Sequence, residues 1–385
     1  MAGANRILTS HVGSLIRPDD LVAMLRARSH GMTVDERAFN DCLARAVADI
    51  VRRQAEIGID IVSDGEFGKT ISWSRYILER LGGFERRRAE PGFAVATYGK
   101  DRRDFAEFYK EYDAAQESEG MRGWVVTGPI TYKAQSVIAR DIASLKAALG
   151  QVRVTDAFMA AVAPASVAPD REDEHYRNSD ESLAAIARAL NQEYRAIVDA
   201  GFIVQIDDSY FASMYDTMVP PGALADYRKW AAMQVEVLNA ALEGIPADRA
   251  RYHVCWGSWN GPHSNDVALK DIVDLVLRIK VGGYSLEMAN PRHEHEWSVW
   301  ETVRLPDDKV LLPGLISHAT NVVEHPELVA ERIVRLAKLV GAERVIASTD
   351  CGFAQGPFVR RVHPSIQWAK LAALVEGARL ASKVV

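Results

Sequence analysis

Short apolar segments alternate with longer amphipathic segments along most of this chain, and this alternation constrains the fold more than any other feature. Segments that are apolar throughout and separated by helices indicate parallel β-strands covered by helices on the outside. Eight such strands fit a closed (β/α)8 TIM barrel of the α/β class, which is the predicted fold. The expected strands are 6–14, 59–66, 123–129, 202–208, 251–257, 283–290, 310–316 and 344–352.

The segments between these strands repeat apolar residues every three to four positions, which predicts helices. These helices are expected at 35–57, 102–118, 180–200, 222–242, 266–279 and 325–340. Residues 154–166 fit either a ninth strand or an irregular insertion, and we favour the insertion. A doubly wound open sheet is the alternative fold, but no Gly-x-Gly-x-x-Gly element follows the first strand to support a dinucleotide-binding version.

We expect residues 1–385 to form a single barrel domain with two loop insertions. Residues 82–122 are rich in charge and carry several glycines, which is typical of a long excursion over the barrel mouth. A second insertion is expected at about 152–180, because the polar loop 169–182 follows the ambiguous segment. The length of 385 residues is compatible with one large barrel or two ordinary domains, so the expectation of one domain depends on the strand pattern.

Composition narrows the range of partners and compartments. The formal net charge is −6 and no basic stripe is present, so we expect no nucleic acid partner. No apolar run reaches the roughly eighteen residues that a transmembrane helix needs, so we expect no membrane association. The three cysteines Cys42, Cys255 and Cys351 do not form a disulfide framework, which favours a reducing, cytoplasmic setting. Association into a homo-oligomer is left open.

Polar residues gather where the expected strands end. In a barrel, the carboxyl ends of the strands converge on one face, and active sites lie at that face. Helix caps and solvated loops explain one or two such residues, but not this pattern at nearly every strand. The residues are His11, Ser14, Asp64, Glu66, Thr127, Asp207, Asp208, His253, Cys255, Glu287, Asn290, His318, Asp350 and Cys351.

A metal site is predicted from four of these residues. His253 and Cys255 are two positions apart on a strand, so their side chains leave it on the same side. Cys351 ends the last strand and Glu287 ends the strand after the His-x-Cys pair. One imidazole, two thiols and one carboxylate are the ligands of a tetrahedral zinc site. Two alternatives are cysteines that serve as small buried hydrophobes and a disulfide between Cys255 and Cys351.

Other residues carry weaker signals. Cys42 lies inside an amphipathic helix and is expected in the core. His318 is a candidate proton donor or an ordinary loop histidine. His293 and His295 follow a strand in NPRHEHEW and fit an exposed polar loop better than an anion site. Trp256 and Trp259 are expected to line the pocket or to pack over the barrel rim.

The motifs, taken in order, resemble the catalytic barrel of cobalamin-independent methionine synthase and its shorter relatives. The relatives include single-barrel methyltransferases and the zinc enzyme that adds coenzyme M to epoxides. The matching stretches are SHVGSLIRP (10–18), IVSDGEF (61–67), VTGPIT (126–131), VQIDD (204–208), HVC (253–255), the Glu of SLEMAN and TDCGF (349–353).

The resemblance implies zinc bound by His253, Cys255, Glu287 and Cys351. It also implies that the turn around His11, Gly13 and Ser14 holds the amino-acid part of a thiol substrate, together with Glu66 and Asp207, and that Trp256 contributes to the pocket. His318 would correspond, after a one-residue gap, to the proton-donating histidine of the family. The resemblance is to the shorter relatives, so we expect no counterpart of the additional N-terminal half of the folate-dependent enzymes. Ser209 stands where the family often has a Glu- or Pro-containing turn, so folate and homocysteine are not fixed.

This ligand set suits thiol alkylation. A free thiol has a pKa near ~8.5 and is mostly protonated at neutral pH, whereas zinc coordination removes the proton. Two thiolates and a carboxylate keep the zinc electron-rich, so a coordinated substrate thiolate stays nucleophilic. The expected reaction is zinc-dependent transfer of a methyl or other alkyl group to a small-molecule thiol such as homocysteine, from methylfolate, a methylated corrinoid or a methoxylated compound. His318 or an acidic residue such as Asp207 or Glu66 would supply protons.

Three other functions stay open from the sequence. The first is zinc-dependent addition of a thiol to an epoxide or another electrophile. The second is a metal-free barrel lyase or hydrolase that uses aspartate and glutamate residues. The third is a non-catalytic protein that binds thiols or metal.

Overall fold

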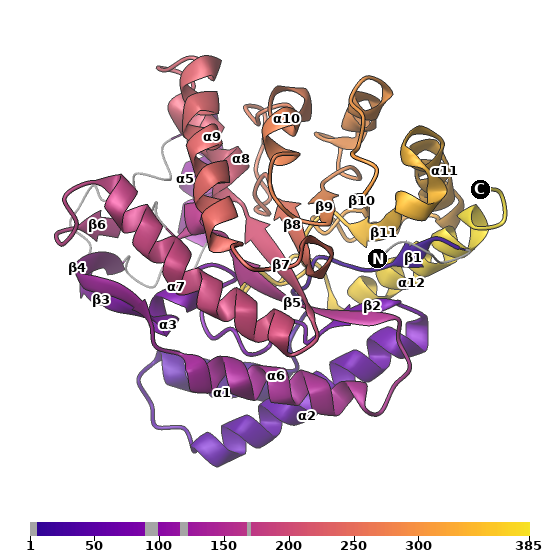
Figure 1. The fold of residues 1–385 in the computed structure, drawn as a ribbon. Helices are drawn as coiled ribbons and strands as arrows, with labels where there is room; N and C mark the ends of the chain where they lie inside the picture. The colour runs from indigo at the N-terminus through magenta and orange to yellow at the C-terminus, as the bar shows by residue number, and fades with distance from the viewer. Residues whose placement is uncertain (1–5, 89–98, 116–121, 168–170) are drawn as a thin grey trace.

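The computed structural model describes residues 6–88, 99–115, 122–167 and 171–385. Eight strands of these residues form one parallel sheet in the order β1-β11-β10-β9-β8-β7-β5-β2. The Asp60 amide donates to the Thr9 carbonyl oxygen at 3.2 Å, which brings the start of β2 beside β1 and nearly closes the sheet. The fold is the predicted (β/α)8 barrel (Figure 1). The strands are β1 (Leu8–Thr9), β2 (Ile61–Ser63), β5 (Asp156–Val162), β7 (Ile203–Asp208), β8 (Ala250–Val254), β9 (Gly283–Leu286), β10 (Val310–Ile316) and β11 (Ile346–Thr349).

Helices cover the outside of the barrel and bury one face against it. In α2, Asp35 accepts the Ala38 amide at 2.8 Å to begin the helix, and Gly58 ends it at φ 95°. The longer helices are α1 (Asp19–Ser29), α2 (Glu36–Ile57), α5 (Ala106–Ala115), α6 (Gln135–Leu149), α7 (Ser179–Asp199), α8 (Tyr210–Met218), α9 (Leu224–Ala241), α11 (Pro326–Val340) and α12 (Pro364–Ala381). The shorter ones are α3 (Tyr76–Arg80), α4 (Lys100–Asp104) and α10 (Val273–Val276), with a 3-10 segment at Glu294–Glu301.

The core has two apolar layers, one inside the barrel and one between the sheet and its helices. The inner layer is small, so the short strands need only a few large side chains to fill it. The outer layer is far larger and includes Phe39 of α2 and Tyr194 of α7. The inner layer consists of Leu8, Ile61, Phe158, Ile203, Val310, Leu312 and Ile346.

Two of the expected strand assignments are wrong. Residues 154–166 were expected in an insertion, but Asp156–Val162 forms β5, which lies in the barrel between β2 and β7. Residues 123–129 do form a strand, but it belongs to β4 (Arg122–Tyr132), outside the barrel. There β4 pairs with β3 (Leu81–Arg88) and β6 (Arg171–Asp173) in a separate three-stranded sheet. Figure 1 shows this sheet at one side of the barrel.

The helix expected at 266–279 is also mostly absent. The chain instead makes a 3-10 turn at Leu269–Asp271 and the four-residue helix α10. In the part of the chain that the structure describes, no helix is both long enough and apolar enough to cross a bilayer.

Candidate active site

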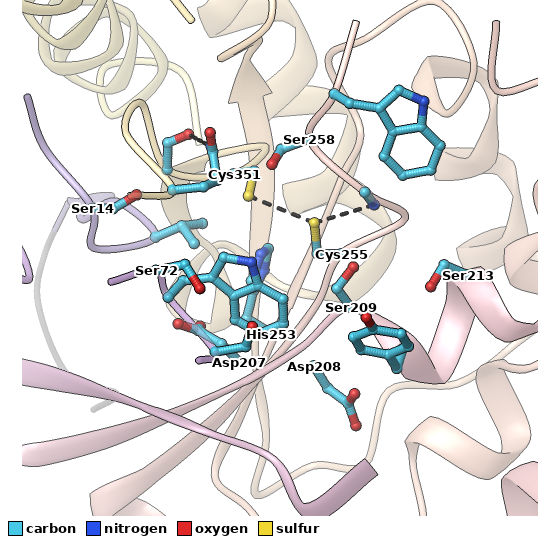
Figure 2. A pocket seen from close by; sticks show the side chains of 18 of the residues that line it. Ser14, Ser72, Asp207, Asp208, Ser209, Ser213, His253, Cys255, Ser258 and Cys351 are labelled. Carbon is cyan, nitrogen blue, oxygen red and sulfur yellow. Dashed lines mark hydrogen bonds between the residues drawn. The ribbon is translucent and has the colours of Figure 1, made fainter. Parts of the chain in front are cut away.

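The carboxyl ends of β8 and β11 bring one histidine and two cysteines together. His253 lies in β8, Cys255 follows that strand, and Cys351 follows β11. The two Sγ atoms are 3.6 Å apart, and both cysteines are free thiols. One ligand atom from each of the three residues lies within 4.8 Å of the others. Figure 2 shows the two sulfur atoms facing each other with His253 beside them. We call these three residues the His-Cys-Cys cluster.

The cluster has the chemistry of a metal site. Both ring nitrogens of His253 are buried and neither makes a hydrogen bond of good geometry among the described residues, although the Ser285 backbone lies close enough to raise the pKa of the ring. Burial lowers the pKa of His253 to about 3, so the imidazole is neutral and its lone pair is free. A buried polar group without a partner is rare in a folded protein and indicates a missing ligand. Two thiols with a neutral imidazole are donors that zinc prefers.

Glu287, the fourth predicted ligand, lies next to the cluster but outside it. Its Oε1 accepts the Trp256 amide at 3.0 Å, and its Oε2 accepts Asn290 Nδ2 at 2.8 Å. Burial, and then the charge of the neighbouring Cys255 thiol group, raise the pKa of this carboxyl. The structure therefore groups three of the four predicted ligands and places the fourth beside Cys255.

Two carboxylates form an acidic wall of the same cavity. Glu66 has φ 61°, and its Oε2 lies 2.8 Å from Lys69 Nζ. Asp207, at the end of β7, accepts Gln205 Nε2 at 2.7 Å. Burial and the nearby charge of Glu66 raise the pKa of Asp207 to about 8. Both side chains line the cavity, so the structure brings these two predicted residues together.

The turn after β1 fits closely against this wall. Gly13 has φ 131°, and a Cβ at that position would lie 2.7 Å from Glu66 Oε1. Ser14 and Val12 line the cavity. His11 does not: its Nε2 faces Gln54 Oε1 at 2.7 Å, and its Nδ1 accepts the Gly13 amide at 3.1 Å. His11 therefore stabilises the turn through the Gly13 amide without lining the cavity.

The structure places Trp256 and His318 outside the lining of the cavity. Trp256 packs on the ring of His293, with centroids 4.4 Å apart, and its Nε1 donates to the Val267 carbonyl oxygen at 2.8 Å. His318 is buried, and neither of its ring nitrogens has a partner among the described residues. Burial, and then the positive charge of Arg361, lower the pKa of His318 to about 3.

The cavity has a volume of about 460 Å³, and polar and aromatic side chains line it together with the cluster. Trp259 lines it and donates from Nε1 to the Tyr109 hydroxyl at 3.0 Å. Tyr109 comes from α5, in the excursion expected to cover the barrel mouth. Sequence reasoning did not single out Tyr109 or Asp101, because charged helical segments of this kind are common on protein surfaces.

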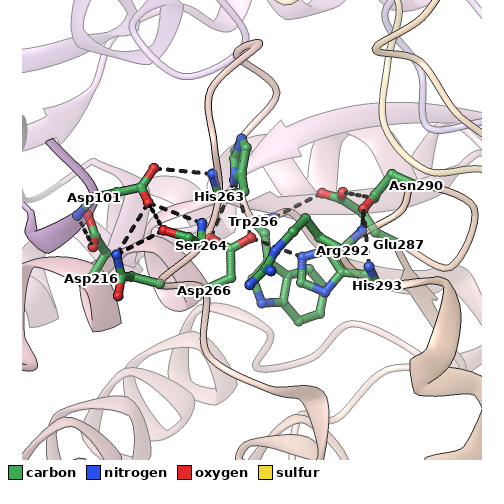
Figure 3. A network of polar contacts seen from close by, with 12 residues as sticks. Asp101, Asp216, Trp256, His263, Ser264, Asp266, Glu287, Asn290, Arg292 and His293 are labelled. Atoms are coloured by element: carbon green, nitrogen blue, oxygen red, sulfur yellow. Dashed lines mark hydrogen bonds and ion pairs between the residues drawn. The ribbon is translucent and has the colours of Figure 1, made fainter. Parts of the chain in front are cut away.

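A buried polar network supports the loop that carries Trp259 (Figure 3). Asp101 accepts the amides of His263 at 3.1 Å and Ser264 at 3.0 Å. Asp266 contacts His263 at 3.2 Å and His293 at 3.1 Å. His293, expected in an exposed loop, is buried, whereas His295 is exposed as expected. Burial alone would lower the pKa of His293, but its hydrogen bonds to Asp266 and Glu296 outweigh burial and raise it to about 10.

Comparison with known proteins gives consistent results. The model of the cobalamin-independent synthase catalytic domain matches residues 160–373. The 2-hydroxypropyl-CoM lyase of Xanthobacter autotrophicus is 26% identical over 371 residues, which cover 89% of this chain and 86% of that protein. A methionine synthase of Saccharolobus solfataricus is 25% identical over 378 residues, which cover 97% of this chain and 94% of that protein.

Among solved structures, a B12-independent methionine synthase from a Shewanella species in complex with selenomethionine superimposes with a TM-score of 0.72. The alignment covers 98% of both chains at 20% sequence identity, so it shows a shared fold.

Proposed function

Because the chain belongs to the cobalamin-independent synthase catalytic-domain family, we propose that it transfers a methyl or other alkyl group to a small-molecule thiol with the help of zinc. Homocysteine is the proposed acceptor, since relatives of similar length are named methionine synthase. The alkyl donor is not assigned.

The observation that carries this proposal is the His-Cys-Cys cluster inside the cavity. Its three donors lie within 4.8 Å of one another, and the His253 ring makes no hydrogen bond of good geometry among the described residues. The cluster shares its cavity with Glu66 and Asp207. A metal ion bound by the cluster and a substrate ammonium group bound by the two carboxylates would therefore lie side by side in the cavity.

A zinc ion, when bound, would supply the positive charge that keeps a substrate thiol deprotonated at neutral pH. His253, Cys255 and Cys351 would hold that ion, and we propose Glu287 as the fourth ligand because it lies beside Cys255. Two thiolates and a carboxylate would carry three negative charges against the two positive charges of zinc, and this excess negative charge favours transfer to sulfur over hydrolysis.

The other residues would bind and orient the thiol substrate. Glu66 and Asp207 would accept hydrogen bonds from its ammonium group, with Ser14 at the adjacent turn. Trp259 and Tyr109 would exclude water from the cavity. We propose His318 as the source of the leaving-group proton; because it lies outside the cavity lining and its ring is neutral, a negative charge on the substrate would have to raise its pKa, and its side chain would have to move to the cavity, before it could donate.

One observation favours a second reaction at the same site. A relative that is 26% identical is named 2-hydroxypropyl-CoM lyase, so addition of a thiol to an epoxide is the alternative. A screen of methyl donors against a screen of epoxides, each with zinc-loaded protein and a thiol, separates the two reactions.

Metal analysis tests the proposal. We expect about one zinc ion per chain in purified protein, and loss of most of it in Cys255→Ser and in Cys351→Ser, since each removes one of the soft donors. Cys42→Ser is the matched control, because Cys42 is buried in α2 and donates to Asp20 Oδ2 at 3.4 Å, away from the cluster. Protein that turns over without zinc would instead support a metal-free lyase or hydrolase.

A further inference from the structure

We propose that Arg361 forms an anion-binding subsite in the cavity, for a carboxylate or sulfonate group on one of the two substrates. The proposal rests on the proposed function only in assuming that the cavity binds those substrates. It adds the residue that would bind an acidic group of one substrate, whichever thiol and alkyl donor the cavity takes.

Arg361 is held in the wall of the cavity by neutral partners. It follows β11 on the same loop as Cys351, and its side chain is half-buried. Its Nε donates to Gln355 Oε1 at 3.2 Å, and its Nη1 donates to the Tyr112 hydroxyl at 3.5 Å. Gln355 is itself held in place. Its side chain donates to the Gly352 carbonyl oxygen, and its backbone carbonyl oxygen accepts the Trp73 amide at 2.8 Å.

The guanidinium of Arg361 has donors to spare. It carries five N–H groups in a planar fork, and the described residues use two of them. Among the described residues, no carboxylate makes an ion pair with it. Arg102 lines the same cavity, but the carboxylate of Asp113 neutralises its charge: Nη1 and Nη2 of Arg102 donate hydrogen bonds to Asp113 at 2.7 and 3.2 Å.

The surroundings of Arg361 favour a ligand that carries one positive and one negative group. Ser14 lies beside this loop, since its Oγ accepts the Ala354 amide at 3.4 Å. Glu66 and Asp207 line the same cavity as Arg361, so a ligand with an ammonium group and an acid group would find a partner for each. A guanidinium that lacks an ion pair and faces a cavity is suited to bidentate binding of a planar acid group.

The acidic group could belong to the thiol acceptor or to the alkyl donor. Methanesulfonate is a probe that carries the acid group but no thiol and no transferable alkyl chemistry. Its binding to the full-length protein as purified can be followed by saturation-transfer NMR of its methyl signal. The readout needs neither zinc nor turnover, so a failure of the proposed function would leave this test intact.

We expect saturable methanesulfonate binding to the wild type, and binding weaker by about tenfold or more in Arg361→Met. Gln355→Glu is a second variant that keeps the arginine and sets a carboxylate beside its Nε, so it should weaken binding similarly. Arg379→Met is the control for net charge, since Arg379 pairs with Glu376 on the exposed face of α12. Circular dichroism checks that each variant is folded.

Competition identifies the source of the acid group. If L-homocysteine displaces methanesulfonate and 3-aminopropane-1-thiol, which lacks the carboxylate, does not, the group belongs to the acceptor. If neither thiol displaces it, the acid group at Arg361 is not the carboxylate of homocysteine. The proposal is overturned if the wild type binds no methanesulfonate, or if Arg361→Met and Gln355→Glu both bind it as well as the wild type does.

Discussion

At the residue scale, spacing along a strand was the most informative signal. His253 and Cys255 leave β8 on one side because they are two positions apart, and this places both near Cys351. The position of Glu287 also followed from its strand, but the direction of its carboxylate did not. That direction depends on the Trp256 amide and the Asn290 amide group, which no pattern in the sequence pairs with it.

A substitution at Gly13 should weaken substrate binding without affecting the metal. In Gly13→Ala the new methyl group would meet Glu66 Oε1 at 2.7 Å and push this carboxylate from its place. We expect binding of an amino-acid thiol to fall by about tenfold, comparable to losing one charged hydrogen bond. Calorimetric titration measures the affinity, and zinc content should be unchanged.

Gly31→Ala is the matched control for this prediction. Gly31 also has a positive φ, 74°, but a Cβ there would have no atom within 4 Å. Both variants should lose about 1–2 kcal/mol of unfolding free energy from backbone strain. Equal loss of thiol binding in both would show that strain, and not the contact with Glu66, is responsible.

The affinity of the cavity for an ammonium group should rise with pH. With the pKa of Asp207 raised to about 8 by burial and by Glu66, its carboxyl is mostly protonated at pH 6 and about half ionised at pH 8. An ammonium needs the ionised form, so L-methionine, which has no thiol to titrate, should bind up to about tenfold more tightly for each pH unit from 6 towards 8.

Asp207→Asn tests the origin of this pH dependence, because the amide cannot ionise. Its affinity for L-methionine should be low and nearly constant over the same range. Wild-type affinity that does not change between pH 6 and pH 8 would refute the assignment of Asp207 as the ammonium partner.

At the element scale, most strands and helices followed from the alternation of apolar and amphipathic segments, but two strands were confused. GWVVTGP and DAFMAAV are both short and apolar, so composition does not separate a barrel strand from a strand of the added sheet. What decides is pairing: β4 runs antiparallel to β3, whereas β5 lies between β2 and β7. Contacts between segments far apart in the sequence are not encoded in local periodicity.

The connection between α4 and the loop at 263–265 can be tested by removing one carboxylate. Asp101→Ala leaves the amides of His263 and Ser264 without their acceptor. We expect these two amides to exchange hydrogen faster by about fivefold, since each lost hydrogen bond is worth about 1 kcal/mol. The Michaelis constant for the thiol should rise, because Trp259 loses its support.

Glu107→Ala in the following helix α5 is the control, because Glu107 is exposed and makes no hydrogen bond to residues 263–265 among the described residues, whereas Asp104 accepts Asn265 Nδ2 at 3.3 Å. The exchange rates of this control should stay within about twofold of the wild type. Unchanged protection of residues 263 and 264 in Asp101→Ala would exclude a supporting role for Asp101.

At the scale of the whole molecule, the prediction of a single barrel was confirmed, and the location of the His-Cys-Cys cluster followed from it. The circular order of the strands explains why residues from β1, β7, β8 and β11 meet in one cavity. We propose that the chain is one catalytic domain in which the sheet of β3, β4 and β6 is an addition to the barrel. The expected absence of nucleic acid and membrane partners, the cytoplasmic setting and the open question of a homo-oligomer stay predictions.

The wide separation of the two cysteines has a consequence for how the protein is made. Cys351 comes 96 residues after Cys255, and β11 must pair with both β1 and β10 before its sulfur reaches the other one. During translation, a nascent chain that has exposed β8 but not yet β11 would carry an incomplete set of ligands. If the cluster binds zinc as proposed, tight binding would therefore require that β11 has closed the barrel, and partly synthesised chains would not retain the ion.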